Sequence, residues 1–311
     1  MEKSFVILPD VTCDISEKLA KEYGIEVVYG HYTTPDGVEH KSYHEWTDEE
    51  REKFYAALKK NPNGFTTSPP NIDECYTVFE KYVKENVPVI AISISEKLSG
   101  TYGFMTKARE EILKKYPSAE VYVIDSLRFS VGFGLMAIIA SIMRDQGKSA
   151  KEVYEYLEAN KNRIHETGWM DDLSFVAKKG RISNAKAFFG TLAGIKPLGE
   201  FDNTGLTTVI GKVKGEKAAY SVLLDYIEQH IENPKDQIIM IATSTRHKQA
   251  QYYKEQIEAR FSPKAVYVVD VFPNSGINVG PGLMAAYYFG KPISDGLVEE
   301  KKAIAEIINK K

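Results

Sequence analysis

A short, uninterrupted apolar run in the first third of the chain constrains the fold more than any other feature. Residues 89–94 read VIAISI, and the polar loop SEKLSGT follows at 95–101. Strands that are buried on both faces read as continuous apolar runs of this kind. Helical spacing begins near residue 102 and continues to residue 115. A strand that leads through a loop into a helix is the unit of a parallel sheet with crossover helices.

The same order of strand, loop and helix recurs through the first half of the chain. We expect further strands at 5–8, 25–29 and 121–124, and helices at 15–23, 48–60, 72–84, 130–144 and 148–163. Asp14 and Thr47 precede the first two of these helices, and both residue types cap helices well. The polar stretch 36–45 is expected to protrude as a loop or a small ribbon. We therefore predict an α/β domain over residues 1–163, with a mainly parallel sheet.

Hairpin signals distinguish the second half of the chain. Residues 202–205 read DNTG between two strand-like runs, 195–201 and 206–213, which is typical of a β-hairpin. We also expect strands at 173–176, 238–242 and 265–271, and helices at 185–193, 246–260, 283–289 and 298–309, the helix at 283 being opened by Gly280-Pro281-Gly282. This mixture predicts a C-terminal α+β domain with a mixed sheet over residues 164–311.

The bulk composition argues against several classes of protein. The chain has 40 Lys and Arg against 43 Asp and Glu, so it lacks the basic excess of a nucleic-acid-binding protein. Cys13 and Cys75 are too few for a disulfide framework and indicate a reducing compartment. The N-terminus lacks a signal-peptide pattern, and the most apolar stretch, 129–143, is too short to span a bilayer. We expect a cytoplasmic protein without a transmembrane segment, and transient contact with a membrane surface stays open.

Sequence motifs for nucleotides and metals are missing. The pattern G-x-x-x-x-G-K-[ST] does not occur, and residues 129–134 contain no G-x-G-x-x-G. His40 and His44 are four residues apart, but no acidic pattern accompanies them. We therefore expect both histidines at the surface and predict no metal site.

Ser99 lies in the loop after the strand at 89–94, and three roles compete for it. A hydrolase nucleophile would read G-x-S-x-G, but the run here is KLSGT, without the leading glycine. A helix cap is the simplest role, because serine and threonine favour that position. An anion receptor is the third role. Cap and receptor are compatible, because the free amides of a first helical turn bind anions.

Three further segments carry groups that suit an anion. Thr67 lies in FTTSPPN, where turn chemistry is the simpler explanation. Arg181 lies in a glycine-bounded turn, and it is either solvent-exposed or recognises an oxyanion with its planar fork. Lys214 follows the hairpin and suits the same role or a solvated face. Asp10 and Ser126 follow two expected strands, at the edge where open α/β sheets bind ligands.

Six segments, in order along residues 4–290, together resemble one family, the DegV-like proteins, which include the fatty-acid-binding subunits of bacterial fatty acid kinase. They read DVTCD at 10–14, TSPPN at 67–71, LSGTY at 98–102, DS at 125–126 before Gly132 and Gly134, GRIS at 180–183 with IKP at 195–197, and NVGPG at 278–282. The chain departs from the family pattern at Val11, where the family has serine, and at Asn278, where it has histidine.

The resemblance implies a two-domain DegV-like fold that holds one long-chain fatty acid and needs no further cofactor. It implies that Thr67 and Ser99 bind the carboxylate, with the Gly100 amide beside them and Asn278 at the position of the family histidine. Such a protein is not itself an enzyme.

The same resemblance implies a partner. A separate kinase subunit would convert the bound acid to an acyl phosphate for phospholipid synthesis, and the family links the position of Arg181 to that phosphoryl transfer. Lys214 stands at a second basic position of this kind. The alternative from the residues alone is a serine esterase or acyl-hydrolase that uses Ser99.

Overall fold

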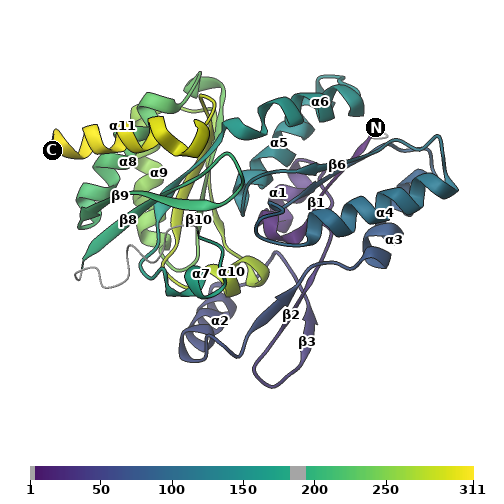
Figure 1. Cartoon of the computed structure of the whole chain (residues 1–311), viewed down its shortest axis with the longest axis horizontal. Helices are drawn as coiled ribbons and strands as arrows, with labels where there is room; N and C mark the ends of the chain where they lie inside the picture. Colours follow the sequence, from purple (N-terminus) through teal and green to yellow (C-terminus); the bar gives the residue numbers. More distant parts are fainter. Residues whose placement is uncertain (1–3, 183–193) are drawn as a thin grey trace.

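The structure, a computed structural model, describes residues 4–182 and 194–311 (Figure 1). A three-stranded parallel sheet of order β1-β5-β6 is formed by β1 (Val6–Pro9), β5 (Val89–Ser93) and β6 (Val121–Asp125). The central strand β5 is buried along its whole length, as its apolar run predicts. The expected strand at 25–29 is an extended segment beside β1, in which the amide of Val28 donates to the Pro9 carbonyl at 2.9 Å. Only an isolated bridge joins this segment to the chain after β1, so residues 25–29 do not form a full strand.

Helices cover both faces of this parallel sheet. Side chains that point one way from its strands, such as Val6 and Ala91, pack with α3 and α4. Those that point the other way, such as Ile7 and Ile92, pack with α5. This alternation is the two-residue period of a strand. The helices of this half are α1 (Glu17–Glu22), α2 (Asp48–Lys60), α3 (Ile72–Val83), α4 (Thr101–Lys115), α5 (Val131–Asp145) and α6 (Ala150–Asn160).

The predicted caps of the first two helices have different outcomes. Thr47 caps α2 as expected, and Glu50 completes a capping box with it. The role expected for Asp14 is wrong, because α1 begins three residues later and is capped by Ser16. Asp14 instead adopts a left-handed backbone conformation, with φ at 51°.

The ribbon expected near residues 36–45 is present, as part of a small antiparallel sheet of order β3-β2-β4. It projects from the body of the molecule beside α2 (Figure 1). Its strands are β2 (His31–Thr33), β3 (Glu39–Lys41) and β4 (Thr66–Ser68). The strand β4 places Thr67 opposite Tyr32 at the base of this projection.

A mixed six-stranded sheet dominates the second half, with the order β11-β10-β12-β7-β8-β9. Only β10 and β11 pair in parallel among these neighbours, and the other pairs are antiparallel. The expected hairpin is present as β8 and β9. The strands are β7 (Ile164–Trp169), β8 (Ile195–Phe201), β9 (Thr207–Lys214), β10 (Ile238–Thr243), β11 (Ala265–Asp270) and β12 (Met284–Phe289).

Three expectations for this half are wrong. Residues 284–289 form the inner strand β12 and not a helix, because a short apolar run reads alike in a buried strand and in a buried helix. The segment expected as a strand at 173–176 lies in the short helix α7 (Ser174–Lys178). Gly280 does not open a helix but ends one, α10 (Pro273–Val279), with φ at 73°. The expected helix at 185–193 lies outside the described residues.

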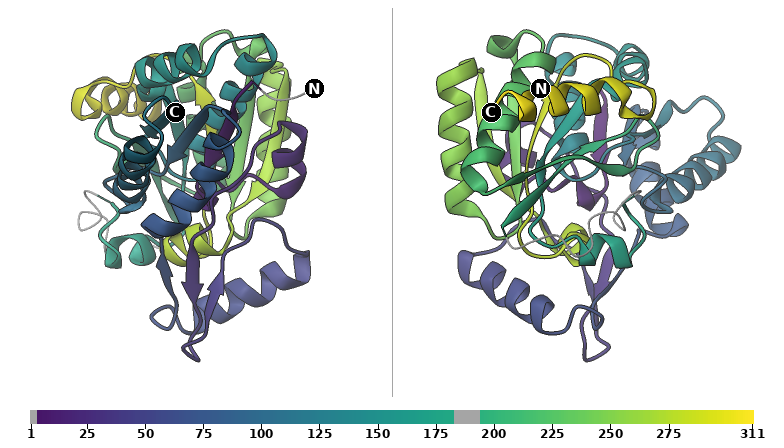
Figure 2. Two further views of the ribbon diagram at one scale, coloured as in Figure 1. Left: turned by 90° about the vertical axis from the view of Figure 1, so that its right-hand side faces the viewer. Right: turned by 60° about the vertical axis from the view of Figure 1, so that its left-hand side comes forward.

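The helix α5 lies between the two large sheets. It contacts β1 of the parallel sheet and β10 and β12 of the mixed sheet, so one apolar core joins both. The opposite face of the mixed sheet is covered by three amphipathic helices, which are visible beside it in Figures 1 and 2. They are α8 (Glu216–His230), α9 (His247–Phe261) and α11 (Val298–Asn309).

Candidate functional site

A cavity lies where the loops after β1 and β5 meet β4, α7 and α10. Figure 1 shows α7 and α10 close together at this edge of the mixed sheet. The polar side chains that line the cavity are Thr12, Thr67, Ser68, Arg181, Thr207, Asn274 and Asn278. The other lining residues are apolar: Ile94, Leu98, Phe129, Met170, Val176, Phe201 and Val279. This composition suits a ligand with one polar group and a long apolar part.

Thr67 and Asn278 face each other across the cavity lining. The Asn278 side-chain amide donates to Oγ1 of Thr67 at 3.3 Å and to the backbone carbonyl of Asn274 at 2.8 Å. Both amide protons of Asn278 are therefore used within the protein. Since the Thr67 oxygen accepts from Asn278, its own proton is free to point at a ligand. This geometry makes Thr67 a donor and makes Asn278 the residue that orients it.

Ser99 lies on the loop beside the cavity but does not line it. Its Oγ is 2.9 Å from Oγ1 of Thr101 and accepts from the Thr101 amide at 3.4 Å. The helix α4 begins at Thr101 behind Gly100, and no side chain caps it in the usual way. Leu98, the preceding residue, does line the cavity. Ser99 and Gly100 are thus adjacent to the pocket, without direct exposure to it.

Arg181 lines the cavity and joins two loops. Its Nε donates to the Leu98 carbonyl at 3.2 Å, and its Nη1 donates to the Lys179 carbonyl. The guanidinium therefore holds the turn after α7 against the loop that carries Ser99. Lys214, at the end of β9, is exposed and does not line the cavity. The structure brings Arg181 to the pocket and leaves Lys214 outside it.

Asp10 and Ser126 directly follow β1 and β6, and neither is among the residues that line the cavity. The Asp10 carboxylate accepts from the Ile94 amide at 2.8 Å and from the Thr12 amide at 2.9 Å. Burial raises the pKa of Asp10 to about 6, although these hydrogen bonds lower it. The Ser126 hydroxyl bonds to the backbone of Arg128. Asp10 positions the loop that presents Thr12, whereas Ser126 shapes its own turn.

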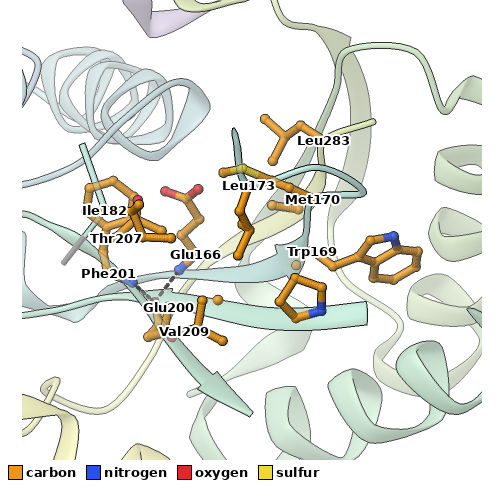
Figure 3. A pocket seen from close by; sticks show the side chains of 14 residues that line it. Glu166, Trp169, Met170, Leu173, Ile182, Glu200, Phe201, Thr207, Val209 and Leu283 are labelled. Atoms are coloured by element: carbon orange, nitrogen blue, oxygen red, sulfur yellow. Dashed lines mark hydrogen bonds between the residues drawn. The ribbon is translucent and has the colours of Figure 1, made fainter. Parts of the chain in front are cut away.

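A second, smaller cavity adjoins the first. Met170, Phe201 and Thr207 line both cavities, so the two spaces adjoin. The second cavity lies against β7, β8, β9 and β12, and Figure 3 shows its lining. Most of the lining is apolar, but Glu166 on β7 also borders it. No sequence pattern singled out Glu166, because the segment IHETGW alternates neither as a strand nor as a helix.

The nucleophile alternative lacks a base. Of the residues that the structure describes, no histidine lines the first cavity, and the partner of the Ser99 hydroxyl is another hydroxyl. His165, His230 and His247 are bonded to Glu200, to the Tyr226 carbonyl and to Asp270. Activation of a serine requires a base within hydrogen-bond reach. The geometry thus favours the anion receptor over the nucleophile.

The structure also bears on the expectations for metals, for His44 and for a membrane span. Within 4–182 and 194–311 no group of three His, Cys, Asp or Glu side chains is placed to hold a metal ion. The expectation that His44 lies at the surface is wrong, because its ring is buried and bonds to Tyr29 and to the Ile15 carbonyl. None of the helices described is long and apolar enough to cross a bilayer.

Comparisons of the sequence with known proteins give a consistent result. A family model described as "Uncharacterised protein, DegV family COG1307" matches residues 4–291. A DegV domain-containing protein of Clostridium perfringens is 31% identical over 290 residues, which is 93% of this chain and 98% of that protein. A DegV domain-containing protein of Streptococcus pyogenes serotype M1 is 29% identical over 290 residues, 93% of this chain and 99% of that one.

Solved structures share the fold. A DegV lipid-binding protein of Thermotoga maritima superposes with a TM-score of 0.80 at 21% identity, over 93% of this chain and 99% of that one. A fatty-acid-binding DegV family protein of Thermus thermophilus superposes with a TM-score of 0.82 at 23% identity, over 93% of this chain and 100% of that one. A related structure from Ruminococcus gnavus, with a TM-score of 0.81 at 21% identity over 92% and 100%, was solved with vaccenic acid.

Proposed function

This chain belongs to the DegV family, and from that premise we propose that it binds one long-chain fatty acid in its two adjoining cavities. The observation that carries the proposal is the continuity of the space. A first cavity with hydroxyl, amide and guanidinium groups in its lining leads past Met170 and Phe201 into a second, mainly apolar one. A fatty acid has the same asymmetry, with one anionic end and one long apolar chain.

The tail supplies the affinity in this proposal. Burial of one methylene group contributes about 0.8 kcal/mol, so ~15 methylenes contribute on the order of 10 kcal/mol. A hydrogen bond to the head group adds about 1 kcal/mol. The head-group contacts therefore mainly set the direction in which the acid enters.

The head group is assigned to the polar lining. Thr67 donates its free hydroxyl proton to the carboxylate, and Asn278 holds Thr67 in that orientation. Ser99 and the Gly100 amide complete the receptor after a small shift of their loop, since Leu98 already borders the cavity. Arg181 lines the same cavity, but its guanidinium donates to the Leu98 and Lys179 carbonyls and is assigned no bond to the carboxylate. A carboxylate taken out of water needs such donors, because an unpaired buried charge is costly.

The finer role that we propose is that of a carrier. The chain presents the bound carboxylate to a separate fatty acid kinase subunit in the cytoplasm, and the acyl phosphate that forms enters phospholipid synthesis. Arg181 and Lys214 meet the transferred phosphoryl group in this scheme. The ordered family motifs support it. The protein itself then performs no chemistry.

Native mass spectrometry tests the binding. Protein purified from a bacterial host should carry one fatty acid per chain, and delipidated protein should take up one equivalent of added stearic acid. Consistent absence of lipid, with no uptake, would contradict the proposed function.

A reconstituted kinase reaction tests the carrier role. Arg181→Ala should keep its fatty-acid affinity within a few-fold of the wild type and slow acyl-phosphate formation with a fatty acid kinase catalytic subunit and ATP. Arg181→Lys, which keeps the charge and loses the planar guanidinium, is the matched variant. Its rate of acyl-phosphate formation should lie between those of the wild type and Arg181→Ala. Unchanged turnover in both variants would remove Arg181 from phosphoryl transfer.

A further inference from the structure

A carboxylic acid borders the apolar end of the proposed fatty-acid site. Glu166 lies in the middle of β7, is only 5% exposed, and lines the second cavity. Figure 3 shows its carboxyl group directed among the lining side chains rather than toward Glu200. A hydrocarbon tail offers nothing to such a group. The position of Glu166 therefore needs an explanation beyond a lipid tail.

One oxygen of the Glu166 carboxyl lacks a hydrogen bond within the protein. Among the described residues its Oε2 forms none, and the hydroxyl of Tyr287, its cross-strand neighbour on β12, forms none either, although the two groups lie close enough for Tyr287 to lower the pKa of Glu166. The neighbouring acid differs in this respect. The Glu200 carboxyl group bonds to Nδ1 of His165 at 2.8 Å and accepts from the Glu166 amide at 2.8 Å and from the Phe201 amide at 2.9 Å. Of these two buried acids, Glu200 has its hydrogen bonds within the protein, whereas Oε2 of Glu166 is left to bond to a ligand.

The protonation of Glu166 determines what it can bind. Burial raises the pKa of its carboxyl well above the usual range, an effect larger than the lowering by Tyr287 and by the buried cation of Arg128. A neutral carboxyl group offers one donor and one acceptor. An alcohol hydroxyl also offers one donor and one acceptor, so the two groups are complementary. A ligand with a carboxylate at this end is disfavoured, because no Lys, Arg or His is among the described residues that line this cavity.

We propose that Glu166 receives a hydroxyl group on the chain of the bound acid, so that the preferred ligand is a hydroxy fatty acid. The inference rests on the proposed function, because it assumes that the acyl chain extends from the first cavity into the second. A plain acyl chain covers Glu166 and leaves its carboxyl without a partner, which is unfavourable. A chain with a hydroxyl at the matching carbon restores both hydrogen bonds.

Binding measurements with a panel of acids test the inference. Delipidated protein is titrated with stearic acid and with 18-carbon acids that carry one hydroxyl at carbon 9, 10, 12 or 17. At least one hydroxy acid should bind the wild type about tenfold more tightly than stearic acid does. Glu166→Leu should remove this preference or reverse it, whereas Glu166→Gln, which keeps a donor and an acceptor, should retain most of it.

A control variant and the contrary outcomes complete the design. Val298→Ala alters an exposed apolar residue that lines neither cavity, and it should leave the ratio of the two affinities unchanged. If stearic acid binds and every hydroxy acid binds no more tightly, the inference about Glu166 is overturned and the proposed function stands. If no acid binds at all, both fail. A preference that persists in Glu166→Leu would also overturn the inference.

Discussion

The side-chain amide of Asn278 donates to Oγ1 of Thr67 at 3.3 Å, across 211 positions of sequence. This bond joins α10 of the C-terminal half to β4 of the projecting ribbon. Both residues line the first cavity. Two segments that are unrelated in the sequence therefore form one polar wall, and the orientation of the Thr67 hydroxyl depends on a residue from the other half.

The hydroxyl donors should control head-group binding. The double variant Thr67→Val with Ser99→Ala should bind fatty acid more weakly by about 1–3 kcal/mol, because two donors to the carboxylate are lost. Isothermal titration calorimetry measures the affinity, and thermal melting checks that the fold survives. Thr67→Ser keeps the hydroxyl and serves as the control, with affinity close to the wild type. Equal affinity of the double variant and the wild type would show that the carboxylate lies elsewhere.

Substitution at Asn278 should introduce a dependence on pH. Asn278→His places a titratable ring beside Thr67, and an imidazolium ion attracts a carboxylate. Relative to the wild type, the variant should bind fatty acid more tightly at pH 5.5 than at pH 7.5. Asn278→Leu, which cannot titrate or orient Thr67, should bind more weakly at both values. The ratio of variant to wild-type affinity is the quantity to follow, and a ratio that does not change with pH would place residue 278 away from the head group.

Close packing at Gly168 should make that position intolerant of a side chain. A Cβ at Gly168 on β7 would overlap the carbonyl oxygen of Met284 and the Cα of Ala285, so Gly168→Ala should lower the free energy of unfolding by at least about 1–3 kcal/mol. Its strand partner Gly199 is the matched control, because a Cβ there lies 3.8 Å from Thr207. Gly199→Ala should be neutral or stabilise by roughly 0.5 kcal/mol. Chemical denaturation measures both, and equal effects would refute the packing argument.

The buried carboxyl of Asp14 should make stability depend on pH. It accepts hydrogen bonds from Ser130 at 2.6 Å and from the Phe272 amide at 3.0 Å, yet burial raises its pKa from 3.8 to about 8. Because the folded-state pKa lies above the unfolded value, the folded protein binds more protons between those two pH values. The contribution of Asp14 to the free energy of unfolding therefore falls as pH rises from about 4 to about 8.

Asp14→Asn should remove this contribution, because asparagine resembles the neutral acid and does not titrate. Denaturation at pH 5 and pH 8 should show a smaller loss of stability with rising pH in the variant than in the wild type. The exposed Asp73→Asn is the control and should follow the wild-type profile. Identical profiles for Asp14→Asn and the wild type would mean that Asp14 does not titrate in this range.

Local sequence patterns predicted much of the fold wherever the spacing of apolar residues and the capping or turn residues indicate the same element. The apolar run of β5, the capping box of α2 and the turn between β8 and β9 each carry their own signal, and each is present as expected. The ordered motifs likewise indicate the family, and it is the resemblance to that family that draws attention to Thr67, Arg181 and Asn278.

Other elements have no local signal. β7 contains the polar residues His165, Glu166 and Thr167, and it forms a buried strand because Glu200 on β8 bonds to the His165 ring and to the backbone amide of Glu166. β12 is apolar throughout, so its sequence suits a buried helix equally well. Pairing with β10 and β7 makes it a strand. Such choices depend on hydrogen bonds to distant segments, which no short window of sequence contains.

The sequence by itself determined which side chains are available to bind an anion, because hydroxyl, amide and guanidinium groups are fixed by residue type. Only the tertiary structure decided which of them share a cavity. Thr67, Arg181 and Asn278 line it, Ser99 lies beside it, and Lys214 lies outside it. Likewise, only the packing of β7 against β12 put Glu166 at the apolar end without a partner for Oε2 among the described residues. The physical reason is that burial and hydrogen-bond satisfaction are properties of neighbours in space, and the chain brings such neighbours together from segments that are, for Thr67 and Asn278, 211 residues apart.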